Sequence, residues 1–117
     1  MIAEITNQAS CEEILELSRA KPVFLIKHST VCPVSASAWR EFSDFAEGEE
    51  RAFFYKVLVR ENRETSLYIA EQTGIGHQSP QIILFVKGQA IWNESHWGIK
   101  SSHLARELKN SLKEYNS

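Results

Sequence analysis

Hydrophobic positions follow two patterns along the chain: short continuous apolar runs, and longer stretches in which apolar residues recur every three or four positions. The continuous runs predict strands that are buried on both faces, because such strands show no polar alternation. A further strand is expected after Lys87-Gly88, a pair that favours a hairpin turn. The four predicted strands cover residues 23–26, 52–59, 81–86 and 89–94.

The stretches with helical spacing predict four helices. The first begins at Ser10, whose spacing to Glu13 is that of a capping box, and it runs to about Ala20. The last is expected to be capped by Ser102 and to carry one apolar stripe on its buried side. That stripe consists of Leu104, Leu108 and Leu112.

The two central helices have clear boundaries in the sequence. Pro33 suits the first position of a helix, where its missing N–H costs nothing, and Gly48 ends that helix. The other covers residues 63–73 and ends at Gly74. Strands linked through helices are expected to run parallel, and the closing hairpin adds an antiparallel pair at the edge. We therefore predict a single α/β domain over residues 1–117, a mixed four-stranded sheet with helices on both faces.

Composition narrows the classes of function. The chain has 117 residues, 43% of them hydrophobic and 24% charged, which is typical of one globular domain. A net charge of −2 argues against a nucleic-acid partner, and the apolar runs are too short to span a membrane. The first ten residues lack the features of a signal peptide, so a cytoplasmic, reducing location is expected. In that setting the two cysteines are expected to be thiols.

Cys32 is the candidate for chemistry. It falls between a predicted buried strand and the helix that begins at Pro33, and ligands of α/β sheets bind at such positions. The unpaired N–H groups and the dipole of a helix N-terminus favour a thiolate, which is the nucleophile of disulfide exchange. The alternative is that Cys32 is an ordinary small buried residue.

Nearly the whole chain resembles the thioredoxin fold family. Cys32-Pro33-Val34-Ser35 stands where that family has Cys-x-x-Cys, and the segment from Ser79-Pro80 to Gly88 is similar to its cis-proline strand. The resemblance implies that the Ser79–Pro80 bond is cis and lies against Cys32. It also implies that the backbone of Ser79 pairs with an extended thiol substrate. The substrate-binding residues are then Pro33, Ser35, Ser79 and Pro80, with Cys32 catalytic.

Two departures from the dithiol pattern indicate a single-thiol mechanism. Ser35 replaces the second cysteine, and Ile26 stands where the family has a buried aspartate that assists that second thiol. Cys32 would then take a small thiol from a mixed disulfide and need an external thiol to be reset. For Ser35 two roles stay open, a hydrogen bond to the thiolate or a helix-capping hydroxyl.

Within the fold, the segment Val31-Cys32-Pro33-Val34-Ser35 and the later triplet Ser95-His96-Trp97 resemble the monothiol bacilliredoxins. That family removes bacillithiol from oxidised protein cysteines. The resemblance implies bacillithiolated proteins and a low-molecular-weight thiol as partners, with bacillithiol as the exchanging thiol and no bound cofactor. Basic side chains that could meet the malate carboxylates of bacillithiol are Lys56, Arg60 and Arg63.

Other polar candidates have weaker support. Cys11 could resolve Cys32, although a packing role is the commoner one for such a residue. His28 and His77 flank the site in sequence and could favour the thiolate if protonated, or could simply be packed. His96 and His103 do not form a zinc-ligand spacing with Cys32, so no metal is expected. Trp39 and Trp92 are expected in the core, whereas the sequence does not decide the exposure of Trp97.

Three other functions are alternatives. A peroxiredoxin-like site is disfavoured because Leu25 stands where that family has a proline. A glutaredoxin-like iron–sulfur carrier shares the Cys-x-x-Ser spacing, but Pro33 replaces its usual glycine and the paired glycines after the proline strand are missing. The third is a non-catalytic binding module of thioredoxin fold. Colour of the purified protein tests the carrier, and alkylation of Cys32 against pH tests the module.

Overall fold

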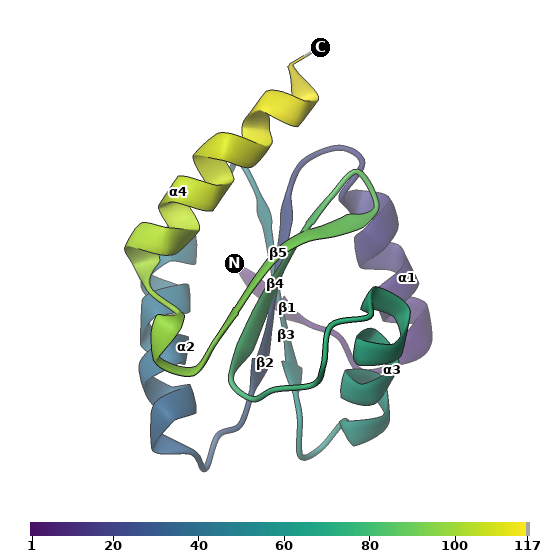
Figure 1. Cartoon of the computed structure of the whole chain (residues 1–117), viewed down its shortest axis with the longest axis vertical. Coiled ribbons are helices and arrows are strands. Elements are labelled where there is room, and N and C mark those ends of the chain that lie inside the picture. Colours follow the sequence, from purple (N-terminus) through teal and green to yellow (C-terminus); the bar gives the residue numbers. More distant parts are fainter. Residues whose placement is uncertain (117) are drawn as a thin grey trace.

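The computed structural model describes residues 1–116, and it shows a five-stranded sheet between two layers of helices (Figure 1). The strands are β1 (Ile2–Glu4), β2 (Val23–His28), β3 (Phe53–Leu58), β4 (Gln81–Val86) and β5 (Gln89–Ser95). The helices are α1 (Gln8–Leu17), α2 (Pro33–Ala46), α3 (Arg63–Thr73) and α4 (Ser101–Leu112), with short 3-10 turns η1 (His96–Gly98) and η2 (Lys113–Tyr115). Helices α2 and α4 cover one face of the sheet, and α1 and α3 cover the other (Figure 1). The predicted α/β class is confirmed.

The sheet differs from the prediction in two respects. It has five strands in the order β1-β3-β2-β4-β5, because the three-residue β1 pairs in parallel with β3. Such a short segment has no apolar run, so its pairing depends on β3 being in place. β4 follows a helix yet runs antiparallel to β2, so the expectation of parallel pairing was wrong for this strand. Segment 74–80 enters β4 at the edge where β2 ends, since Lys27 pairs with Gln81.

Two predicted helix starts were wrong, and contacts at those starts give the reason. α1 begins earlier than expected because the Asn7 side chain, not Ser10, caps it by accepting a hydrogen bond from the Ser10 N–H at 2.8 Å. At α4 the predicted capping residue Ser102 lies inside the helix. The Ser101 N–H instead donates to Glu41 Oε1 of α2 at 2.7 Å, a cap that comes from another helix. Pro33 as the first residue of α2 and Gly74, at φ 74°, as the end of α3 are both as predicted.

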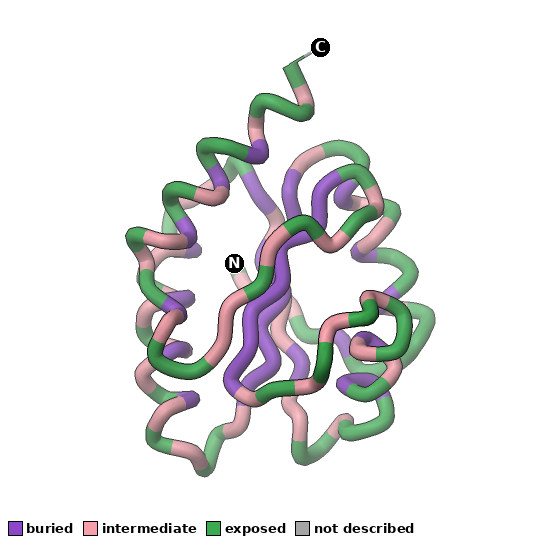
Figure 2. The backbone as a smooth tube through the Cα atoms, viewed as in Figure 1, coloured by how far each residue is buried: buried purple, intermediate pink, exposed green. Residues whose placement is uncertain are grey.

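An apolar cluster lies on each face of the sheet. Every residue of β2 and β4 is buried, and the buried trace follows these central strands (Figure 2). The cluster beneath α2 and α4 is centred on Phe24, Ile26, Phe42, Leu84 and Leu104, and the other on Ile5, Ile14, Leu25, Ile69 and Ile83. The ends of β2 and β4 are therefore held by packing on both sides. Within residues 1–116 no helix combines the length and the apolar character that a membrane span requires.

Candidate active site

Cys32 lies at the N-terminus of α2, directly after the turn that follows β2. It is the N-cap residue with an extended backbone, and its carbonyl accepts a hydrogen bond from the Ala36 N–H at 3.0 Å. Its own N–H donates to the Ser29 carbonyl at 3.4 Å, which closes the turn. The residue is partly exposed and is a free cysteine. This partly exposed cysteine therefore lies at the N-terminus of a helix, the end that interacts favourably with negative charge.

Ser35 is fully buried at 0% exposure, and its hydroxyl contacts two groups that precede α2. Ser35 Oγ accepts a hydrogen bond from the Ser29 N–H at 2.9 Å and lies 2.8 Å from His28 Nδ1. Neither partner is Cys32. The hydroxyl thus joins the first turn of the helix to the end of β2. This contact is neither a hydrogen bond to the Cys32 thiolate nor a helix cap, the two roles that the sequence left open.

His28 is the last residue of β2, and only 8% of its surface is exposed. Its ring stacks on Trp39 of α2 with centroids 4.9 Å apart and an interplanar angle of 27°. Burial, and then the positive charge of Lys56, lower the pKa of His28. The imidazole is therefore neutral around neutral pH, so only one of its nitrogens carries a hydrogen.

The Ser79–Pro80 peptide bond is cis, as the resemblance implied. Pro80 directly precedes β4, and its carbonyl accepts a hydrogen bond from the His96 N–H at 3.0 Å. The loop before β4, the turn before α2 and the turn after β5 therefore lie at one edge of the sheet. All five predicted site residues, listed as Cys32, Pro33, Ser35, Ser79 and Pro80, fall at this edge.

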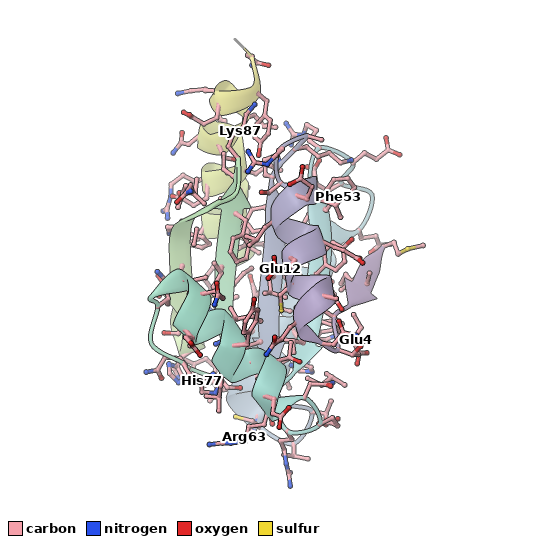
Figure 3. The ribbon with its side chains drawn as sticks, turned by 90° about the vertical axis from the view of Figure 1, so that its right-hand side faces the viewer. Glu4, Glu12, Phe53, Arg63, His77 and Lys87 are labelled. Carbon is pink, nitrogen blue, oxygen red and sulfur yellow. The ribbon has the colours of Figure 1, made fainter. Side chains whose placement is uncertain are left out.

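Lys27 is a feature of this edge to which the sequence analysis gave no role. It is fully buried within β2, and its Nζ lies 3.1 Å from His77 Nδ1. Burial lowers the pKa of Lys27 to about 8. Burial, Lys27 and Arg63 also lower the pKa of His77, and Figure 3 shows His77 and Arg63 at the same end of the molecule. The signal in the sequence was a lysine that directly follows the apolar run of β2 and precedes the candidate site.

Cys11 belongs to the opposite face of the sheet from α2. It is 6% exposed, it packs in the α1/α3 cluster, and burial raises its pKa to about 11. It also lines a cavity of about 160 Å³ between α1, α3 and the β4–β5 hairpin. The structure therefore does not bring Cys11 to Cys32.

Two large apolar side chains are exposed in segments at the candidate edge. Val31 directly precedes Cys32 and is 65% exposed, while Trp97 in η1 is 62% exposed. Trp97 follows His96, whose backbone has φ 55° and whose N–H bonds to Pro80. Trp97 is thus exposed in the turn that follows β5, a point that the sequence left open. Trp39 and Trp92 pack against the core, as predicted.

The comparisons with known proteins agree with this geometry. Residues 3–104 match the model of the monothiol bacilliredoxin BrxC family. The chain belongs to this family. A solved structure described as a candidate oxidoreductase with a thioredoxin fold is 35% identical, with 90% of this chain and 91% of that chain covered and a TM-score of 0.82. Membership of the bacilliredoxin family and this neighbour support a thiol redox function.

More distant neighbours show the fold alone. Thioredoxin Mala s 13 from Malassezia sympodialis is 21% identical over 95% of this chain and 90% of its own, with a TM-score of 0.74. Thioredoxin from Trypanosoma brucei brucei is 17% identical over 97% of this chain and 92% of its own, with a TM-score of 0.76. The bacilliredoxin chain thus has the thioredoxin fold.

Proposed function

We propose that the protein is a monothiol oxidoreductase that removes bacillithiol from mixed disulfides on protein cysteines, with Cys32 as the nucleophile. The observation that carries the proposal is one partly exposed cysteine at the start of α2 together with a serine, Ser35, at the place of the second thiol. Membership of the monothiol bacilliredoxin family supports bacillithiol as the exchanging thiol.

In the first step the Cys32 thiolate attacks the bacillithiol sulfur of the mixed disulfide. The bond between that sulfur and the protein cysteine breaks, and the protein thiolate leaves and takes a proton from water. One disulfide is consumed and one, between Cys32 and bacillithiol, is formed, so the step needs no external oxidant or reductant. The free N–H groups at the start of α2 favour the negative charge before the attack.

In the second step an external thiolate resets the enzyme. A second bacillithiol attacks the bacillithiol sulfur bound to Cys32, releases the Cys32 thiolate and leaves as bacillithiol disulfide. Ser35 has no sulfur with which to close an internal disulfide, and Cys11 is buried on the other face. Cys32 therefore depends on a small thiol for its return.

The loop before β4 supports binding of the oxidised protein segment. Ser79 precedes β4 by two positions, so its backbone lies outside the strand pairing of β4 with β2. An extended substrate segment can pair with it, while Val31 and Trp97 offer apolar contact around the sulfur. This arrangement suits a substrate cysteine in an unfolded or mobile stretch of chain.

Intact mass spectrometry tests the proposal. The reduced protein is incubated with oxidised bacillithiol and, separately, with oxidised glutathione. We expect one bacillithiol adduct on the wild type and on Cys11→Ala, and none on Cys32→Ser. Equal adduct formation with glutathione would contradict the choice of bacillithiol, and no adduct with either disulfide would favour a non-catalytic binding module.

A further inference from the structure

Lys27 determines which nitrogen of the His77 ring carries a hydrogen. A charged amine has hydrogens to donate and no lone pair, so Lys27 Nζ, 3.1 Å from His77 Nδ1, donates to that nitrogen. Burial, Lys27 and Arg63 lower the pKa of His77, so the ring is neutral around neutral pH. A neutral ring that accepts at Nδ1 carries its single hydrogen on Nε2. His77 is therefore a hydrogen-bond donor on the side of the ring away from Lys27.

The donor side of the His77 ring is available to an external group. Lys27 is fully buried, whereas His77 is only partly buried, so the ring extends from the interior toward the surface. Within residues 1–116 the ring has no hydrogen bond besides the one with Lys27. The same loop is also held by Gln81, whose Nε2 donates to the Gly76 carbonyl at 3.0 Å. The Nε2–H is thus held by tertiary contacts and lacks a protein acceptor.

The surroundings of His77 are positively charged. Lys27 lies behind the ring, and Arg63, the exposed first residue of α3, is close enough to act on its pKa. Figure 3 shows Arg63 and His77 at the same end of the molecule. None of the ion pairs among the described residues includes Lys27 or Arg63. An N–H donor near an unpaired guanidinium suits a carboxylate, which arginine binds through two parallel hydrogen bonds.

The three basic residues that the sequence offered for carboxylates differ in the structure. Lys56 forms an ion pair with Glu4 at 3.9 Å. Arg60 and Arg63 are both exposed, but of these two only Arg63 is among the groups that lower the pKa of His77. Arg63 is therefore the basic residue that can share a carboxylate with His77.

We propose that His77 and Arg63 form a subsite for a carboxylate of the small thiol, with Lys27 as the positioning residue that holds the His77 hydrogen on Nε2. His77 precedes Ser79 by two positions, at the edge of the sheet where Cys32 lies. The malate carboxylates of bacillithiol lie at the opposite end of that molecule from its sulfur, so they would contact residues other than Cys32. The inference rests on the proposed function and deepens it, because it names residues that select an anionic thiol.

The subsite accounts for a buried amine in a central strand. Lys27 is fully buried in β2, where every other residue except His28 is apolar. Burying a charged amine without a paired carboxylate is unfavourable. An apolar side chain at this position would avoid that cost, but it could neither donate to His77 nor add positive charge behind the ring.

Binding of unreactive analogues tests the subsite apart from the exchange chemistry. S-methyl bacillithiol keeps both malate carboxylates and has no free thiol, and its malate dimethyl ester lacks their charges. Calorimetry measures the affinity of the reduced wild type, Arg63→Gln and His77→Phe for both probes. Arg60→Gln is the matched control, because it removes an equal charge from the connection between β3 and α3. Circular dichroism and thermal melting verify that each variant is folded.

We expect the wild type to bind the acid about tenfold more tightly than the ester. Arg63→Gln and His77→Phe should each lose most of this preference by binding the acid more weakly, and Arg60→Gln should keep it. Equal affinity of the wild type for the two probes, or no binding of either, overturns the subsite. An equal loss in Arg60→Gln overturns the role of Arg63, because it would indicate general attraction. If His77→Phe weakens both probes alike, its role is structural and the proposed contact is overturned.

Nuclear magnetic resonance tests the role of Lys27. The ¹⁵N chemical shifts of the His77 ring report which nitrogen carries the hydrogen, and we expect Nε2–H in the wild type at pH 7. Lys27→Met should move the Nδ1 shift, because that nitrogen loses its donor. The Nε2–H signal should move when S-methyl bacillithiol is added and stay in place with the ester. A hydrogen on Nδ1, or an Nδ1 shift unchanged in Lys27→Met, overturns the positioning role.

These measurements separate the subsite from the proposed function, because neither probe can undergo disulfide exchange. Selective binding of the acid by a protein that transfers no bacillithiol would contradict only the proposed function. Transfer of bacillithiol by a protein that binds acid and ester equally would contradict only the subsite.

Discussion

Lys27 Nζ and His77 Nδ1 form a hydrogen bond of 3.1 Å between residues that are fifty positions apart in the sequence. Lys27 is fully buried, and none of the ion pairs among residues 1–116 includes it. Burial lowers the pKa of Lys27 to about 8, so the amine is mostly charged at neutral pH with a neutral imidazole as its acceptor. The contact ties the loop that carries Ser79-Pro80 to β2.

Replacing Lys27 by methionine should stabilise the protein at neutral pH. A buried amine whose pKa is lowered from 10.5 to about 8 costs free energy while it is charged. We expect Lys27→Met to raise the free energy of unfolding by about 2 kcal/mol at pH 7, measured by urea denaturation. In the exchange assay the variant should be slower, because the loop before β4 loses its contact with β2.

The pH dependence has a definite sign. Between pH 8 and 10.5 the unfolded chain keeps the Lys27 proton that the folded protein has released, so the penalty is relieved as pH rises. The advantage of Lys27→Met over the wild type should therefore shrink from pH 7 to pH 10. Cys11 and other groups titrate alike in both proteins, so the difference isolates Lys27. An advantage that grew with pH would contradict the lowered pKa.

Cys32→Ser should abolish removal of bacillithiol from a bacillithiolated protein, because no other described thiol lies at the edge of the sheet with Ser79 and Pro80. Cys11→Ala should keep the wild-type rate, since Cys11 is buried on the α1/α3 face. Release of the small thiol is followed by mass spectrometry of the substrate protein. Activity retained in Cys32→Ser would refute the monothiol mechanism.

Ser35→Cys should convert the site to a dithiol. The N-cap and third positions of a helix bring the two side chains within reach of a disulfide, so we expect oxidation to link Cys32 to the new cysteine. The measurement is the loss of two hydrogens in the intact mass and of two alkylatable thiols. A variant that folds but stays reduced under oxidant would contradict the placement of Ser35 beside Cys32.

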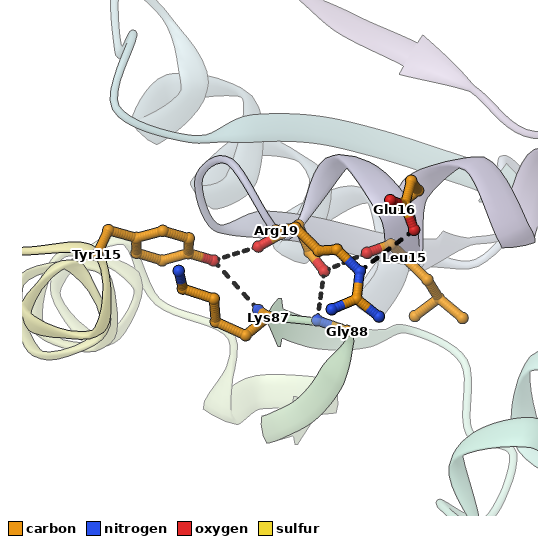
Figure 4. A network of polar contacts seen from close by, with 7 residues as sticks. Leu15, Glu16, Arg19, Lys87, Gly88 and Tyr115 are labelled. Carbon is orange, nitrogen blue, oxygen red and sulfur yellow. Dashed lines mark hydrogen bonds and ion pairs between the residues drawn. The ribbon is translucent and has the colours of Figure 1, made fainter. Parts of the chain in front are cut away.

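Tyr115→Phe should weaken the fold without affecting the chemistry. The Tyr115 hydroxyl donates to the Ser18 carbonyl and accepts from the Lys87 N–H at 3.3 Å, while Ser18 Oγ accepts from the Gly88 N–H at 2.8 Å (Figure 4). The variant should lose about 1 kcal/mol of stability, seen as a lower melting temperature.

This network lies at the end of the molecule opposite the candidate site, since Lys87 and His77 mark opposite ends in Figure 3. The exchange rate of Tyr115→Phe at a temperature where the variant is folded should therefore equal that of the wild type. A rate that fell with intact folding would show that the two ends of the sheet are coupled.

Local rules predicted much of this fold because they act within a few residues. Pro33 has a fixed φ that suits the first turn of α2, and Gly74 adopts the left-handed backbone that ends α3. The start of α4 could not be predicted from local sequence, because the N–H of its first residue, Ser101, donates to Glu41, which lies sixty residues earlier. β1 could not be predicted either, because three residues are too few to show a hydrophobic pattern, and the strand forms only by pairing with β3.

The sequence by itself determined that a single cysteine precedes a helix, that a serine replaces its partner, and that a Ser-Pro pair opens a buried strand. Turns, caps and apolar runs encode such features within short windows of chain. Only the tertiary structure decided that Ser35 meets His28 and that Lys27 meets His77. Those contacts depend on which strand lies beside β2 and in which register, and pairing between distant segments is chosen by the packing of the whole sheet.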